Sequence, residues 1–249
     1  MLLQGLTQSW PMPSWMLIQI LFWTILVRSI FLLDVNRLRS FSDVSAWASS
    51  LIFFALLWRL SAGIEPGLSF HIFGSALMTL LFGFPYMLIG GVLGIIANAL
   101  SGVGQIVDIP ASAIAVLIIP GGTTYLIWKL SLRLLPPNFF VYVWGCGFFG
   151  AAIGIMVTAT VVTTLLWLSD LYSLDYLLDF YFPYALMQTF PEGFITGTVL
   201  SLLVIYQPEW TPPSGTSFTS ITSSQVMRII GQKKKPQTSD QPGAWVPVL

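Results

Sequence analysis

Long apolar stretches dominate this sequence and restrict what it can fold into. A hydrocarbon core takes about 20 helical residues to cross. Seven stretches qualify or nearly qualify, and they cover residues 16–33, 44–60, 68–84, 87–100, 109–132, 139–168 and 184–206. Only 8% of the residues are charged, whereas soluble domains carry about a quarter. The sequence therefore predicts an all-α integral membrane protein, a bundle of seven transmembrane helices.

The charged residues between these segments separate by sign. With seven crossings, one side carries the basic residues Arg37, Arg39, Lys129, Arg133, Arg228 and Lys233 to Lys235. The other side carries the acidic residues Glu65, Asp108, Asp170, Asp175 and Asp179. Because basic loops stay in the cytoplasm, we predict a protein of the cell membrane with its amino terminus outside the cell and its carboxy terminus in the cytoplasm. Arg59 is an exception that snorkelling accommodates.

The composition changes abruptly after residue 206. Residues 207–249 are rich in Pro, Ser, Thr, Gly and Gln and contain few large apolar side chains. Such a segment cannot bury enough apolar surface to fold by itself. We therefore expect two parts, a seven-helix transmembrane domain over residues 1–206 and a disordered cytoplasmic tail over residues 207–249.

Glycines recur at helical spacing within the apolar segments. The pairs Gly90/Gly94, Gly150/Gly154 and Gly193/Gly197 are each four residues apart. This spacing lets helix backbones approach closely, so these pairs are predicted at helix–helix contacts. Compact packing of the bundle is enough to explain these pairs, so we assign them no further function. In the fifth segment, Pro120-Gly121-Gly122 predicts a kink.

The inventory of catalytic residues is thin. The chain has one histidine and one cysteine, Cys146, which is predicted to be a small buried hydrophobe without a disulfide. There is no Ser-His-Asp set, no zinc-binding HExxH helix and no phosphate-binding P-loop. The sequence therefore argues against an enzyme, and any ATP hydrolysis must come from another protein. Ten basic residues balance ten acidic ones, which argues against a nucleic-acid partner.

Two ionisable side chains fall at membrane depth. His71 stands at the head of the third apolar segment, where such a residue is costly and counts as a functional candidate; the alternative is an interfacial histidine that caps a helix. Glu192 lies between Pro191 and Gly193, which predict an irregular helix typical of a transport site. The alternative for Glu192 is a structural carboxyl, protonated or bonded across helices. Asn98 could join this polar cluster or simply bond two helices together.

The residues around His71 and Glu192 carry a family resemblance. The string His71-Ile72-x-Gly74-x-x-Leu77-x-x-Leu80-Leu81-Phe82-Gly83 resembles the His-Leu-x-Gly segment of CbiM/NikM-type membrane subunits. Glu192-Gly193-x-x-Thr196-Gly197 resembles that family's Glu-Gly-x-x-Thr-Gly segment. The likeness covers residues 1 to about 210. Further strings, at residues 137–142, 147–151 and 206–210, are similar to a divergent, poorly characterised branch.

The resemblance implies a metal site with one ligand missing. Metal-capturing members begin Met-His and bind the ion through the terminal amine, the second-position histidine and the later histidine. This chain begins Met1-Leu2-Leu3. The implied ligands are therefore His71 and the terminal amine of Met1, with Glu192 and Asn98 as possible additional polar groups. Asp108 or Gln105 could also contribute oxygen.

The resemblance also implies a function and partners. CbiM/NikM-type subunits capture cobalt or nickel for energy-coupling-factor ABC transporters. We accordingly expect a substrate-binding membrane subunit for the uptake of a transition-metal ion, cobalt or nickel, with no permanently bound cofactor. Its partners would be a transmembrane coupling protein and cytoplasmic ATPases. The alternative is a membrane scaffold or assembly factor that kept the fold and lost the metal site, as Leu2 suggests.

Overall fold

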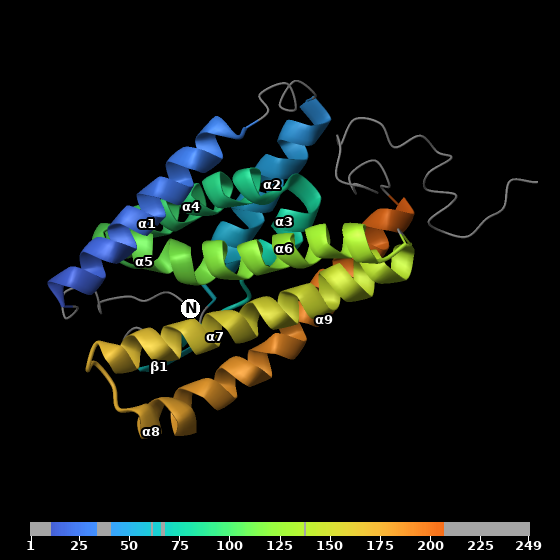
Figure 1. Ribbon diagram of the computed structural model, residues 1–249. Helices are drawn as coiled ribbons and strands as arrows, with labels where there is room; N and C mark the ends of the chain where they lie inside the picture. Colours follow the sequence, from blue (N-terminus) through green and yellow to red (C-terminus); the bar gives the residue numbers. More distant parts are fainter. Residues whose placement is uncertain (1–10, 34–40, 61, 66–67, 137, 207–249) are drawn as a thin grey trace, which may run out of the picture.

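The computed structural model describes residues 11–33, 41–60, 62–65, 68–136 and 138–206 (Figure 1). Within these ranges, four helical runs are long and apolar enough to cross a membrane: Met12–Phe31, Ile106–Leu134, Val141–Leu168 and Leu174–Tyr206. The Met1 amine and the predicted tail over residues 207–249 lie outside the described residues. The described part is mostly helical, with one short β-hairpin and irregular connecting segments.

Three of the four runs are built from several helical pieces. The first run is α1 (Met12–Phe31) alone. The second joins η3 (Ile106–Asp108), α5 (Ile109–Ala113), η4 (Ile114–Ile118) and α6 (Ile119–Leu134). The third joins η5 (Val141–Phe149) and α7 (Gly150–Leu168). The fourth joins α8 (Leu174–Tyr176), η6 (Leu177–Tyr181) and α9 (Phe182–Tyr206).

The kink predicted at Pro120 takes the form of a π-helical turn. The element η4 is a π-helix that ends two residues before Pro120, and α6 then continues through the two glycines. A proline ring clashes with the carbonyl four residues earlier, here that of Val116, and leaves this carbonyl without a helical donor. The wider π turn takes up this misfit without ending the helix.

The prediction of a long third helix over residues 68–84 is wrong. Leu68–Phe70 forms strand β2, which pairs antiparallel with β1 (Ala62–Glu65). The helix α3 covers only Ser75–Phe82, and it is flanked by Gly74 (φ +68°) and Gly83 (φ +87°). Such positive φ angles interrupt a helix, and glycine adopts them at little cost. Eight residues rise only about 12 Å, too little to cross a bilayer alone.

The short helix α3 lies at the centre of the bundle. Residues from Ser75 to Leu81 are all buried, and α3 packs against α6, α7, α9 and α4 (Phe84–Leu100). Figure 1 shows α6, α7 and α9 side by side, while α1, α4 and α2 (Phe41–Leu57) form the other part of the bundle. The helix α3 is therefore a buried core element.

The glycine pairs lie where helices meet. A β-carbon on Gly90 would meet Leu51 of α2, and one on Gly94 would meet Trp58, which follows α2. One on Gly154 would lie 3.0 Å from the backbone oxygen of Pro120, and one on Gly150 would lie 3.5 Å from Thr124, both in α6. Gly193 and Gly197 of α9 face Phe148 of η5. A β-carbon would crowd its neighbours at Gly90, Gly94, Gly154 and Gly193, whereas at Gly150 and Gly197 it would make ordinary van der Waals contact.

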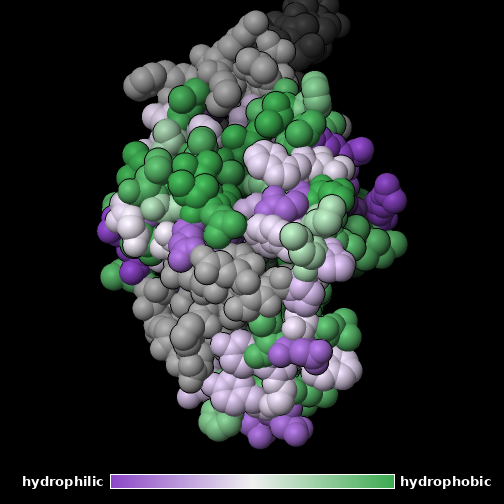
Figure 2. All heavy atoms as spheres, turned by 90° about the vertical axis from the view of Figure 1, so that its left-hand side faces the viewer, coloured by the Kyte–Doolittle hydropathy of each residue, from purple (hydrophilic) through white to green (hydrophobic). Residues whose placement is uncertain are grey.

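One end of the bundle carries hydrophilic as well as apolar surface. Figure 2 views the molecule from the side where α1 begins, α7 ends and α8 lies. Hydrophilic residues interrupt the apolar surface on this face. The exposed acidic residues Asp175 and Asp179 belong to α8 and η6 at this end.

Candidate metal centre

His71 lies in a short irregular segment, residues 71–74, between β2 and α3. Its side chain is buried, with 5% of its surface exposed, and its ring contacts Trp58 and Phe73 at centroid distances of 6.1 and 5.3 Å. The Nδ1 atom lies 3.1 Å from the carbonyl oxygen of Ile72. Because a carbonyl oxygen can only accept, this bond requires the proton on Nδ1 and leaves the lone pair of the neutral ring on Nε2. Metal-binding histidines use this arrangement.

Three side chains from α9 and from the turn after α2 hold the segment that carries His71. The Nε2 atom of Gln188 donates to the backbone oxygen of His71. The carboxylate of Glu192 accepts from the backbone N–H groups of Phe73 and Gly74, each at 2.8 Å. The indole N–H of Trp58 donates to the carbonyl oxygen of Phe73 at 3.1 Å. Two side chains of α9 and the indole of Trp58 therefore hold the backbone around His71 in place.

Glu192 is a buried carboxyl bonded across the bundle. It is 1% exposed, and its partners are backbone groups more than a hundred residues earlier in the chain. The irregular helix predicted around Pro191 and Gly193 is not observed, because α9 continues through both residues. These contacts match the structural alternative for Glu192, with backbone N–H groups as its partners.

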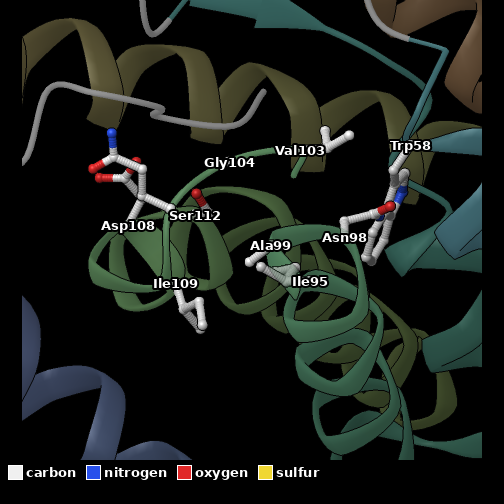
Figure 3. A pocket seen from close by; sticks show the side chains of 10 residues that line it. Trp58, Ile95, Asn98, Ala99, Val103, Gly104, Asp108, Ile109 and Ser112 are labelled. Carbon is white, nitrogen blue, oxygen red and sulfur yellow. The ribbon is translucent and has the colours of Figure 1, made fainter. Parts of the chain in front are cut away.

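A small pocket lies next to Trp58 (Figure 3). Asn98, Asp108 and Ser112 are among the residues that line it, together with Trp58 itself. Figure 3 shows Asn98 beside Trp58 and Asp108 at the other end. Asn98 donates from its amide to the carbonyl oxygen of Ala55 at 3.0 Å, so it bonds α4 to α2.

The predicted polar residues form two groups, and Trp58 borders both of them. His71 and Glu192 meet through the segment 71–74, whereas Asn98 and Asp108 line the pocket next to Trp58. The described residues contain no group of three or more His, Cys, Asp or Glu side chains that could hold a metal ion. Cys146 is buried, and its sulfur lies 3.1 Å from the hydroxyl oxygen of Ser131.

Sequence reasoning missed Gln188 and Trp58. Gln188 stands one helical turn before Glu192, so both side chains project from the same face of α9. The four-residue spacing can be read from the sequence, but a glutamine alone is weak evidence for a functional site. Trp58 ends an apolar run and has no such signal; it is 2% exposed and its indole N–H needs a buried partner.

Comparison with known proteins places the chain in a family. Residues 4–210 match the family model CbiM, described as the cobalt uptake substrate-specific transmembrane region. Comparison with curated proteins gives no significant match. One solved structure, titled as that of a transition metal transporter, has a TM-score of 0.66 and 21% identity, over 78% of this chain and 89% of its own.

A second solved structure, titled as a truncated transition metal transporter, has a TM-score of 0.64 and 20% identity. The match covers 82% of this chain and 97% of that one. At these identities the two structures establish a shared fold, while the family model covers more than half of the chain. This chain is a multi-pass membrane protein and belongs to the CbiM family.

Proposed function

We propose that this chain captures a transition-metal ion outside the cell and passes it inward, as the substrate-binding subunit of an energy-coupling-factor ABC transporter. The observation that carries the proposal is His71. It is the chain's only histidine, and it is buried in a segment fixed by Trp58, Gln188 and Glu192. Family membership and the titles of the two similar structures support a metal ion as the substrate.

The chemistry of the ligands favours cobalt or nickel. Divalent cobalt and nickel prefer nitrogen ligands such as imidazole and amine, and copper binds such sites more tightly still. His71 would supply one imidazole nitrogen, and the terminal amine of Met1 a second. With Leu2 in place of the family's histidine, we expect weak binding, with a Kd of about micromolar or higher.

The proposal needs separate partners. The sequence contains no nucleotide-binding P-loop, so ATP hydrolysis would come from cytoplasmic ATPases and coupling from another transmembrane protein. The alternative function, a membrane scaffold or assembly factor, is favoured by one observation, the presence of Leu2 at the second position. A scaffold would keep the bundle but bind no metal ion.

Metal titration separates the two functions. Cobalt, nickel, copper and zinc are titrated into the purified parent, into His71→Ala and into a form extended at its amino terminus, all without a histidine tag. Metal capture predicts binding to the parent that both changes remove, because each takes away one nitrogen ligand. Absence of binding to the parent favours the scaffold, and binding that survives both changes places the site elsewhere.

The proposed direction of transport rests on topology. We propose seven crossings with the amino terminus outside, because the basic and acidic loops separate by side as the positive-inside rule requires. In this topology the third crossing would be the buried segment around α3. Reporter fusions after Gly104 are expected to read outside the cytoplasm, and fusions after Pro136 inside it. The opposite result at either position would rule out this topology.

A further inference from the structure

We infer that Gln188 and Glu192 act together as positioning residues for His71, gripping the backbone of its segment from one face of α9. We call this pair the α9 grip. The inference rests on the proposed function, since it assigns to these residues a role in metal affinity. It gives Glu192 a different role from that of a metal ligand or a carrier of the transported ion.

The backbone groups of segment 71–74 need hydrogen-bond partners from elsewhere in the chain. Its residues belong to neither β2 nor α3, so sheet or helix bonds do not satisfy all their backbone groups. The α9 grip satisfies three of them: the carbonyl of His71 and the N–H groups of Phe73 and Gly74. Gln188 and Glu192 are spaced four residues apart, which places them on one face of α9.

The carboxylate of Glu192 suits two neighbouring donors. Each of its oxygens accepts one N–H group, at 2.8 Å in both cases, and an ionised carboxylate can satisfy both donors. Gly74 is the N-cap of α3, so a negative charge on Glu192 would lie at the positive end of that helix. Bonds to an ionised group are about twice as strong as neutral ones. An amide in this position would replace one of the two acceptors with a donor.

The grip bears on metal binding through the position of the imidazole. The backbone of His71 is held by Gln188, while its ring lies against Trp58 and Phe73. Phe73 is itself held on both sides, by Glu192 at its N–H and by Trp58 at its carbonyl. Loosening the grip would let the ring leave the geometry that a metal ion requires. Changing partners that orient a ligand typically lowers metal affinity about 10–100-fold.

The test uses two variants and a matched control. Glu192→Gln keeps the size of the side chain but exchanges an acceptor for a donor, and Gln188→Ala removes a single bond. Asp179→Asn makes the same acid-to-amide change at an exposed position of η6. Each protein is titrated with copper(II), whose visible absorption band is recorded. Each is also examined without metal by hydrogen–deuterium exchange of the peptides that contain Phe73 and Gly74.

The expected result is a loss of affinity of about 10–100-fold in both grip variants. Their copper band should shift, and the amides of Phe73 and Gly74 should exchange faster in Glu192→Gln. The Asp179→Asn control should behave as the parent in all three readouts. Unchanged affinity and unchanged exchange in Glu192→Gln would overturn the inference.

Two further outcomes are decided by the same measurements. If Glu192→Gln does not fold, Gln188→Ala decides: melting close to the parent's with weaker copper binding supports the grip, and unchanged copper binding overturns it. If the parent binds no copper, the proposed function fails. The exchange experiment then judges the α9 grip by itself, since faster exchange in Glu192→Gln supports it and unchanged exchange overturns it.

Discussion

Replacing Gly74 with alanine is expected to destabilise the fold by about 2–5 kcal/mol. Gly74 has φ +68°, a conformation that is strained for a residue with a β-carbon. The added β-carbon would also overlap the ring of Phe54, which is buried at 5% exposure. Because the N–H of Gly74 is one of the two bonds to Glu192, the displaced backbone would loosen the His71 segment as well.

Gly102→Ala is the matched control for this change. Gly102 also has a positive φ, of +86°, but a β-carbon there would meet nothing within 4 Å. It should therefore show the backbone strain alone, about 1 kcal/mol. Thermal unfolding in detergent measures both variants against the parent. Equal melting of Gly74→Ala and Gly102→Ala would show that the contact between Gly74 and Phe54 contributes nothing.

Hydropathy predicted the helical membrane-protein class because membrane helices must be apolar along their whole length. It failed at the third segment, where residues 68–84 are apolar but only Ser75–Phe82 is helical. A segment buried among other helices needs the same composition as one that crosses lipid, so composition alone does not separate them. Gly74 and Gly83 were the available signal, since glycines at both ends of a short run are typical of breaks.

The candidate site was predicted only in its residue types. His71 and Glu192 stood out because ionisable side chains are costly at membrane depth. Their connection through the backbone of Phe73 and Gly74 could not be predicted, because it joins positions more than a hundred residues apart. The bond from Asn98 to Ala55 matches the alternative given for Asn98, a bond between two helices, whereas the pocket that Asn98 lines with Asp108 could not be predicted, because its lining comes from separate elements.

The largest functional effect is expected at His71. It is the only histidine in the chain, so any imidazole bound to a metal ion in the untagged protein must belong to it. Copper(II) is the most suitable probe, because it binds nitrogen sites most tightly among the divalent ions of its series. Its unpaired electron also couples magnetically to the remote nitrogen of a bound imidazole.

Pulsed electron paramagnetic resonance of the copper-loaded protein tests the proposed metal capture most directly. The control is His71→Gln, which keeps a polar side chain but removes the imidazole. Coordination by His71 predicts nitrogen modulation from a single imidazole in the parent and its complete loss in His71→Gln. A copper spectrum without imidazole modulation in the parent would contradict the assignment of His71 as the ligand.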